Sequence, residues 1–538
     1  MNIKLKAFKR VFLVCFTLLI VSCSLQSETK IDNKKLKVVV LMGQSNMVGY
    51  AHPRTAWYLT QPLYVPPAKT ATVKSKEFNQ GQFYWQGINF ATGNSEEYND
   101  RGEKLLAEMK ATIKLWRSRV YDNFSRAAKA SGKKPDWNTK EWGPAPVSPK
   151  TQGINRSLMG PFLHGKIRQT GVFKRIEEYI ESPENKLHPN VAINMMADRD
   201  KPIVEDIKRV REIFLNGTKP EDFDKLDEAI KAMGRITDKN RLEYAKLVKK
   251  HINLPIAERT HISALGAVAG EKLELPYQAR SHGLLTLGFS KFATNCGPEY
   301  PFGISFERMV DGPVLIIKCA WGGKSIKTDF RPPSLNTDEE PTGVLWKLSV
   351  EHINSVLKDL PKYHPGYNPQ HGYELSGLVW FQGWNDQGNK DYGNQLVSFI
   401  KDFRKEFNVP KMPVVCGLLG HSSWKQTTFD GDVNSGMLYA AQHSDLRGTV
   451  DLVNTVKYYP KELAFGNMVK AAYGEDSDEY KKAQSVMQRA ISKDPVHYYG
   501  SSKFWFLAGD SMARKLVSLI NGGNPTIHKE AKEILEGK

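Results

Sequence analysis

The fold is decided by the stretch VVVLMGQSNMVGY, which runs from Val38 to Tyr50. Its first five residues are apolar and lead through a glycine into Gln44, Ser45 and Asn46. A short valine-rich run that stops at a glycine predicts a buried strand followed by a tight turn. Open α/β sheets carry their chemistry where such strands end. Ser45 is therefore either a nucleophile or a turn serine that bonds its own backbone.

Four more short apolar runs predict buried strands, and helical patterns separate them. The helical patterns cover Val344–Leu357 and Gln395–Phe407, and a last helix begins at Ser501 or Ser502 and ends at Gly522. This alternation predicts an α/β fold, a three-layer α/β/α sandwich around a short parallel sheet. The predicted strands after the first are Pro313–Ala320, Leu375–Phe381, Met412–Leu419 and Thr449–Val456.

One region breaks this rhythm. From about Arg54 to Gln278 the chain is rich in charged residues, Trp and Tyr, with helical stretches at Tyr98–Ala130 and Pro202–His251. We expect a large, mainly helical insertion at about 54–278 within one domain of residues 37–538. A separate N-terminal domain is the alternative, and it is disfavoured because Val38–Met42 already has the character of a core strand.

The composition is that of a soluble globular protein. The 538 residues are 40% hydrophobic and 25% charged, with a formal net charge of +18, or +14 without the first 22 residues. The lysines are spread out, and nucleic acid is not an expected partner of an exported protein. Attraction to acidic polysaccharide or to a membrane surface stays open.

The N-terminus has the pattern of a signal peptide, residues 1–22. Basic residues between Lys4 and Arg10 precede the apolar run Val11–Val21, which is too short to span a bilayer comfortably. The run ends in Ile-Val-Ser-Cys, which resembles the lipobox of bacterial lipoproteins, so Cys23 is the expected lipidation site and residues 23–36 the tether. We therefore expect an exported, periplasmic or cell-surface lipoprotein whose only membrane contact is its lipid anchor. A plain secreted protein is the alternative.

Three cysteines remain once Cys15, in the signal peptide, and Cys23 are set aside: Cys296, Cys319 and Cys416. An odd number excludes a complete disulfide framework. The apolar surroundings of Cys319 and Cys416 predict small buried side chains. No Cys/His spacing indicates a metal site.

A second chemical feature lies near the other end of the chain, in DPVHYYG. Asp494 and His497 are three residues apart, and Pro495 keeps Asp494 out of helical geometry. In a compact turn the carboxylate reaches one imidazole nitrogen while the other faces outward. A serine hydrolase needs such a base and orienting group. By itself the pattern is equally that of a surface turn.

Oxyanion donors are the third requirement of this chemistry. Gly297 precedes a proline in a loop, where its backbone N–H can be presented without obstruction. Gln382 directly follows a predicted buried strand, where its amide can donate to an oxyanion. The alternative for Gln382 is a structural hydrogen bond to a neighbouring loop.

Five blocks together resemble one family, the SGNH-type hydrolases, and within it the sialate O-acetylesterase and acetylxylan esterase branch. They occur in family order, so the resemblance spans Lys37–Met47 and, with gaps, Leu284–Ile520. The blocks are GQSNM (Gly43–Met47), GPEYPFG (Gly297–Gly303), KCAWGGKSI (Lys318–Ile326), WFQGWND (Trp380–Asp386) and DPVH (Asp494–His497).

The resemblance implies an SGNH/flavodoxin-like fold and a role for each matching residue. Ser45 is the nucleophile, His497 the general base and acid, and Asp494 its orienting carboxylate. The oxyanion hole is formed by the N–H groups of Ser45 and Gly297 and by the Gln382 side chain. No cofactor is implied, and the residues expected to bind substrate are Gln44, Asn46, Gly323 and Trp384.

Two departures from the family pattern bear on the substrate. Trp384 stands where the family often has glutamate, and the insertion after Ser45 is unusually long. The leading interpretation is a serine esterase that removes O-acetyl groups from an oligo- or polysaccharide. The alternatives are an esterase of non-carbohydrate esters and a catalytically silent glycan-binding lipoprotein, whose candidate sugar-stacking residues are Trp57, Trp85, Trp116, Trp137 and Trp142.

Overall fold

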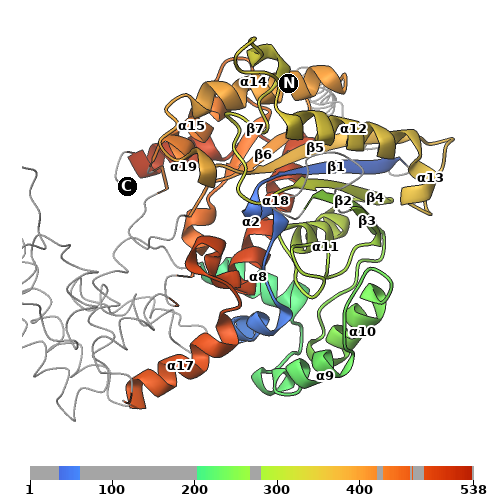
Figure 1. Ribbon diagram of the computed structural model, residues 1–538, viewed down its shortest axis with the longest axis vertical. Coiled ribbons are helices and arrows are strands. Elements are labelled where there is room, and N and C mark those ends of the chain that lie inside the picture. The colour runs from blue at the N-terminus through green and yellow to red at the C-terminus, as the bar shows by residue number, and fades with distance from the viewer. Residues whose placement is uncertain are drawn as a thin grey trace, which may run out of the picture.

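The computed structural model describes residues 35–60, 203–266, 280–420, 428–429, 431–460, 463, 476 and 478–535. In these residues seven strands form one sheet in the order β3-β2-β4-β1-β5-β6-β7 (Figure 1). The signal peptide, Cys23 and the predicted helix at Tyr98–Ala130 lie outside the described residues. The strands are β1 (Leu36–Gly43), β2 (Thr260–Gly266), β3 (Arg280–Leu284), β4 (Val314–Ala320), β5 (Tyr373–Phe381), β6 (Val414–Gly417) and β7 (Val450–Val453).

The centre of the sheet is parallel, as predicted. β1 pairs in parallel with β4 on one side and β5 on the other, so that Val40 lies between Ile317 and Leu378. All eight residues of β1 are buried, which explains why it reads as a continuous apolar run and not as an alternating one. The edge strand β3 runs antiparallel to β2, so the sheet is mixed and not wholly parallel.

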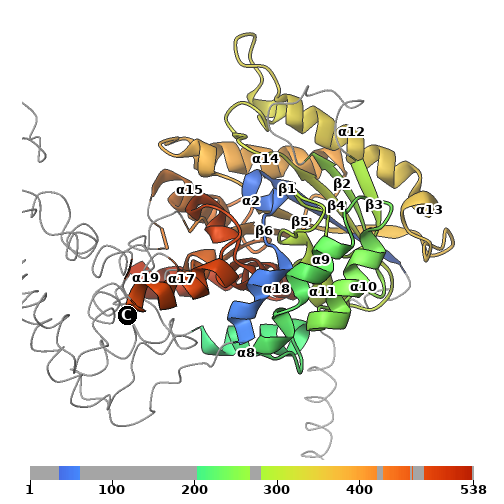
Figure 2. The same ribbon diagram turned by 60° about the horizontal axis from the view of Figure 1, so that its bottom comes forward.

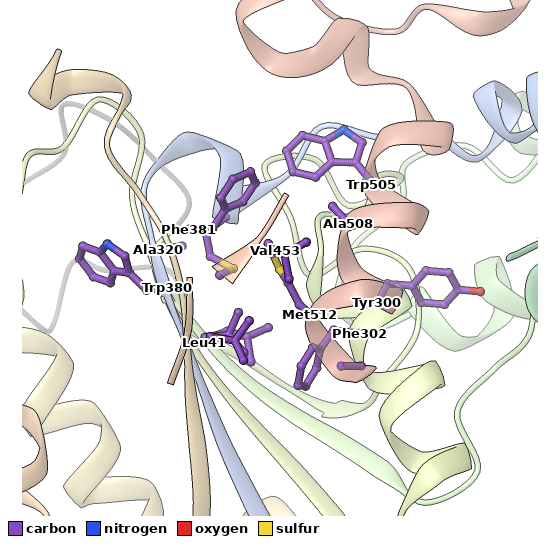
Figure 3. Packing of buried hydrophobic residues seen from close by; sticks show 14 of the residues in the cluster. Leu41, Tyr300, Phe302, Ala320, Trp380, Phe381, Val453, Trp505, Ala508 and Met512 are labelled. Atoms are coloured by element: carbon purple, nitrogen blue, oxygen red, sulfur yellow. The ribbon is translucent and has the colours of Figure 1, made fainter. Parts of the chain in front are cut away.

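Helices cover both faces of the sheet and make the three layers. Helices α11 and α18 pack on one face, while α12 and α14 lie on the other (Figure 1). Trp380 and its neighbour Phe381 point to opposite faces: Phe381 lies on the α18 side, with Met512 and Trp505 (Figure 3). The main helices are α8 (Val204–Phe214), α9 (Leu226–Ala232), α10 (Arg241–Ile252), α11 (Glu299–Met309), α12 (Val344–Lys358), α13 (Leu360–Tyr363), α14 (Tyr392–Glu406), α15 (Gly431–Gln442), α17 (Asp478–Ala490), α18 (Ser502–Ile520) and α19 (Ile527–Leu535).

The strand order places the end of β1 at the point where the topology reverses. After β1 the chain builds β2 and β4 on one side, and then crosses to build β5, β6 and β7 on the other. Ligands of open α/β sheets bind in the crevice outside the carboxyl ends of the strands at such a point. Ser45 follows β1 directly and therefore occupies this position.

The C-terminal boundary predicted for the insertion is wrong. Residues 204–252 are largely helical, as expected for Pro202–His251, but Thr260–Gly266 is β2, a core strand paired in parallel with β4. The sequence does not predict this strand because buried polar residues interrupt its apolar pattern. Ser263 Oγ lies 3.2 Å from His352 Nε2, and Thr260 donates to Glu307 at 2.8 Å, so the fold satisfies them.

The other strand and helix predictions that fall within the described residues agree with the structure. Each predicted strand overlaps β1, β4, β5, β6 or β7, and the last helix is α18, with Ser501 as its N-cap. Cys319 and Cys416 are buried, as predicted, and so is Cys296; all three are free thiols. In the described ranges, no helix combines the length and apolar character that crossing a bilayer requires.

Candidate active site

Ser45 is the first residue of the short helix α2 (Ser45–Val48), immediately after β1. Its side chain is largely buried, and its hydroxyl donates to Oε1 of Gln44 at 2.9 Å. Its hydrogen bond in this structure therefore goes to the preceding residue and not to His497. The backbone N–H of Ser45 belongs to the first turn of α2, where N–H groups have no partner inside the helix. Ser45 thus keeps the position predicted for a nucleophile and for one oxyanion donor.

Asp494 and His497 form the predicted pair in the 3₁₀ turn η10 (Pro495–Gly500). Asp494 Oδ1 lies 2.7 Å from His497 Nδ1 and also accepts the His497 backbone N–H at 3.3 Å. Asp494 has extended geometry and Pro495 occupies the first position of the turn, as the sequence indicated. The bond at Nδ1 leaves Nε2 free of the carboxylate, which is the arrangement that a general base needs.

The next two residues hold this turn in an unusual backbone conformation. Tyr498 and Tyr499 both have positive φ, 50° and 58°, which is uncommon for residues other than glycine. The Tyr498 ring stacks on Phe504 with centroids 3.5 Å apart, so packing against α18 holds the turn. Such conformations persist only where the surrounding structure enforces them, and they gather at functional sites.

The segment after Ser45 carries the residues that bring the two ends of the chain together. The ring of Tyr50 lies against the imidazole of His497, with centroids 4.1 Å apart. Ser492 donates to the carbonyl of Tyr50 at 3.1 Å, and the Ser502 N–H donates to Thr55 at 2.9 Å. Figure 2 shows this N-terminal segment, in blue, beside α17 and α18. The contacts place the Asp494–His497 turn against the segment that begins at Ser45.

The electrostatics favour a neutral imidazole. Burial lowers the pKa of His497 below its ordinary 6.5, and the nearby positive charge of Lys493 lowers it further. The hydrogen bond and charge of Asp494 oppose this change. The pKa of Asp494 is itself lowered: burial raises it, but hydrogen bonds from Lys493 and His497 outweigh that effect. Lys493 Nζ lies 2.9 Å from Asp494 Oδ2, and the sequence analysis did not single it out.

The backbone N–H of Gly297, predicted as an oxyanion donor, already has a partner in this structure. Its N–H donates at 2.8 Å to Oε1 of Glu299, a buried carboxylate two residues further on, and is therefore occupied. Gly297 instead serves a close backbone approach: a Cβ on Gly49, which has φ of 91°, would collide with it. The signal for this role was in the sequence, because a glutamate in the first turn of a helix often bonds a backbone N–H before it.

Glu299 is half of a buried ion pair under the loop after Ser45. Lys318 Nζ donates to Glu299 Oε2 at 2.7 Å, to the carbonyl of Val48 at 2.9 Å and to that of Phe289 at 2.8 Å. All three ammonium N–H groups are therefore used. Burial raises the pKa of Glu299 and lowers the pKa of Lys318, while the opposite charge of each partner resists the change. Lys318 joins β4 to the end of α2.

The side chain of Gln382, the other predicted oxyanion donor, is engaged as well. Its Nε2 donates to the carbonyl of Lys324 at 2.9 Å and to Asp386 at 2.5 Å, and its Oε1 accepts from Tyr392 at 3.1 Å. Both amide N–H groups are occupied in this structure, which is what the structural alternative for Gln382 expects. Asp386 in turn accepts from Ser325, which joins the WGGKS loop to the end of β5.

The four residues expected to bind substrate have different environments. Gln44 and Asn46 are fully buried beside Ser45. Gln44 Nε2 and both polar side-chain atoms of Asn46 have no hydrogen-bond partner among the described residues. Gly323 is exposed and has φ of 69°, and Trp384 is half-buried at the start of the turn η8 (Trp384–Asp386). No contact here assigns any of them to a ligand.

A cavity of about 200 Å³ lies between Val48 and the ends of β2 and β4. Arg241 lines it from α10, with its guanidinium 3.9 Å from the centroid of the Phe289 ring. Ser45, Asp494 and His497 are not among the lining residues, so this cavity is not the catalytic cleft. Across the ranges that the structure describes, no three His, Cys, Asp or Glu side chains gather as metal ligands would.

Comparison with known proteins supports the motif analysis. Residues 271–458 match the family described as carbohydrate esterase, sialic acid-specific acetylesterase. The family resemblance predicted from the motifs is confirmed over this segment. The segment includes Gly297 and Gln382 but not Ser45, Asp494 or His497. No curated protein matches the chain.

Three solved structures are similar to parts of the chain. An Arabidopsis thaliana protein is 17% identical, with a TM-score of 0.23, over 35% of this chain and 67% of its own. A carbohydrate acetylesterase from Xanthomonas citri is 14% identical, with a TM-score of 0.26, over 40% of this chain and 50% of its own. NanS is 12% identical, with a TM-score of 0.25, over 37% of this chain and 68% of its own.

Proposed function

We propose that this protein is a serine esterase that removes O-acetyl groups from carbohydrates through an acetyl-enzyme. The observation that carries the proposal is the Asp494–His497 pair, 2.7 Å apart, packed on Tyr50 of the segment that begins at Ser45. A partly buried imidazole whose pKa is lowered, an orienting carboxylate and a serine at the end of a central strand are the parts that acyl transfer requires. The carbohydrate esterase match supports the substrate class.

The first half of the reaction forms the acetyl-enzyme. The Ser45 hydroxyl exchanges its bond to Gln44 for one to Nε2 of His497, which takes the proton as Oγ attacks the acetyl carbon. The imidazolium returns this proton to the sugar oxygen as the bond between that oxygen and the acetyl carbon breaks. Asp494 holds the tautomer at Nδ1 and stabilises the imidazolium. Ser45 then carries the acetyl group as an ester.

The second half uses water. His497 removes a proton from water as the hydroxide adds to the acetyl carbon, and then gives this proton to Ser45 Oγ as the acyl bond breaks. Acetic acid leaves and releases its proton to solvent as acetate. In both halves the negative oxygen needs N–H donors. Because Gly297 and Gln382 are engaged elsewhere, the backbone N–H of Ser45 is the donor retained from the predicted set.

Acetate release from acetylated oligosaccharides tests the proposal. Wild-type protein should release acetate, and Ser45→Ala should lower kcat by about 10⁴- to 10⁶-fold while its circular dichroism spectrum stays the same. Ser435→Ala is the matched control, since Ser435 is an exposed serine on α15 that bonds the Gly431 carbonyl. Wild-type turnover in Ser45→Ala would refute the assignment. Glycan binding without acetate release would instead favour the silent glycan-binding protein, although Trp57, one of its candidate stacking residues, is buried.

The proposed partner is an acetylated oligo- or polysaccharide outside the cytoplasm. The proposed location is the periplasmic or cell-surface face of a bacterial membrane, held by lipid on Cys23. Both proposals rest on the signal peptide and lipobox patterns of residues 1–23. An exported esterase of this kind would act on glycans that cannot enter the cell.

A further inference from the structure

Phe292 is the most exposed large hydrophobic side chain among the described residues. Half of its surface is open to solvent (50%). It does not stand apart from the site, because its ring meets that of Tyr50 edge to face, with centroids 6.4 Å apart. The ring of Tyr50 also contacts the imidazole of His497. Phe292 is therefore one aromatic contact away from the ring that supports the catalytic imidazole.

The loop that carries Phe292 is held to the segment after Ser45. The Phe292 carbonyl accepts from Ser290 Oγ at 3.1 Å and from the Asn295 N–H at 2.9 Å. The Asn295 side chain donates to the Tyr50 carbonyl at 2.8 Å, and Cys296 forms a two-way backbone bridge with Ala51. The loop has defined bonds on both sides of the exposed ring. The exposure of Phe292 is thus built into the fold.

We propose that Phe292 is a stacking platform for a pyranose ring of the substrate, a role that rests on the proposed esterase function. A pyranose presents a face of C–H groups that packs on an aromatic ring, while its hydroxyl groups remain at the edge for water and polar side chains. A sugar that covers Phe292 removes the exposed apolar surface of the phenyl ring from water, which is favourable. Its position beside Tyr50 places that sugar next to His497.

The surroundings of Phe292 fit a sugar better than a long acyl chain. An acyl chain requires a continuous apolar groove, whereas the neighbours Lys291 and Thr294 are polar and partly exposed. Lys493 also contacts this aromatic pair, with Nζ 5.7 Å from the centroid of the Tyr50 ring. A single exposed aromatic ring on a loop with polar residues matches a sugar ring, which has one apolar face and a polar rim.

The test compares the hydrolysis of two acetyl esters: peracetylated xylobiose, which has sugar rings, and ethyl acetate, which has none. Phe292→Ala should lower the ratio of kcat/KM on the sugar to kcat/KM on ethyl acetate by about 5- to 15-fold, mainly through KM, whereas Phe292→Tyr should keep the wild-type ratio. Tyr373→Ala is the control, because Tyr373 is a comparably exposed aromatic residue (41%) at the opposite end of the sheet, where β5 begins.

The outcomes separate this inference from the proposed function. If wild-type protein hydrolyses both esters and Phe292→Ala leaves their ratio unchanged, the platform is refuted and the esterase proposal stands. If Tyr373→Ala changes the ratio as much as Phe292→Ala, the platform is also refuted. If wild-type protein hydrolyses neither ester, both proposals fail together. A fall confined to Phe292→Ala, with recovery in Phe292→Tyr, supports the platform.

Discussion

Glu299 and Lys318 form an ion pair, 2.7 Å between Oε2 and Nζ, in which both side chains are almost completely buried. The pair connects the start of α11 to β4 and, through the Val48 carbonyl, to the end of α2. A buried pair adds little net stability over an apolar pair of the same shape, but removing one partner leaves the other charge uncompensated. The pair therefore fixes the loop after Ser45 in place.

Replacing Lys318 should destabilise the protein strongly. In Lys318→Met, Glu299 keeps a buried charge and two carbonyl groups lose their donor, so we expect a loss of about 3–5 kcal/mol in the free energy of unfolding. The measurement is urea denaturation followed by fluorescence. The control is Lys401→Met, which breaks a solvent-exposed pair with Asp445 and should leave the free energy of unfolding nearly unchanged. Equal losses in the two variants would contradict the role of the buried pair.

Gln382→Glu should make stability depend on pH. The new carboxylate would lie where Nε2 now lies 2.5 Å from Asp386, so one of the two acids must stay protonated in the folded protein. The pKa of that acid is then higher in the folded than in the unfolded chain. Stability is accordingly retained below about pH 4 and lost as pH rises.

The melting temperature of Gln382→Glu relative to wild type, measured between about pH 4 and pH 8, tests this expectation. The uncharged variant Gln382→Met should show a deficit that stays constant with pH. If the melting temperature of Gln382→Glu were also lowered by the same amount at every pH, the side chains at positions 382 and 386 would not be in contact. A selective fall in kcat with unchanged stability in Gln382→Met would restore Gln382 to the oxyanion hole.

The pH dependence of acetate release should report on His497. Its pKa is lowered by burial, so the neutral base should persist below pH 6.5, and kcat/KM should decline only at lower pH. Lys493→Met removes a charge that lowers this pKa, so the decline should move to higher pH. Asp494→Asn removes the group that raises it, so the decline should move to lower pH.

The two variants should also differ in rate. Asp494→Asn should reduce kcat, though less than His497→Ala, because Pro495 and the ring contact with Tyr50 keep the imidazole partly aligned. Lys401→Met is the charge control and should leave the pH profile in place. Shifts of the same sign in Lys493→Met and Asp494→Asn would exclude His497 as the titrating base.

Cys23→Ser should release the protein from the membrane or leave it unprocessed. The expectation follows from the lipobox pattern, in which lipid on the cysteine is the anchor. Fractionation of cells with detergent extraction, together with mass spectrometry of the mature N-terminus, measures the change. Cys15→Ser is the matched control, because Cys15 lies within the signal peptide and should not alter anchoring. Normal processing and membrane retention of Cys23→Ser would refute the lipoprotein assignment.

The sheet could be read from the sequence wherever a strand is buried and apolar. β1, β4 and the second half of β5 are buried, mainly apolar runs because helices cover both faces of the sheet. β2 could not be read in this way, because Thr260 and Ser263 are core residues whose polar groups are satisfied by Glu307 and His352 from distant helices. Long-range hydrogen bonds leave no periodic signal in the strand itself.

The sequence by itself determined the α/β class, Ser45 at the end of the first strand and the Asp494–His497 turn, because each depends on neighbouring residues. Only the tertiary structure decided which donors remain free: it occupies the N–H of Gly297 with Glu299 and the amide of Gln382 with Lys324 and Asp386. It also decided that Tyr50 supports His497. A hydrogen-bond donor has one partner at a time, and a sequence motif specifies the donor without specifying which acceptor the fold brings within reach.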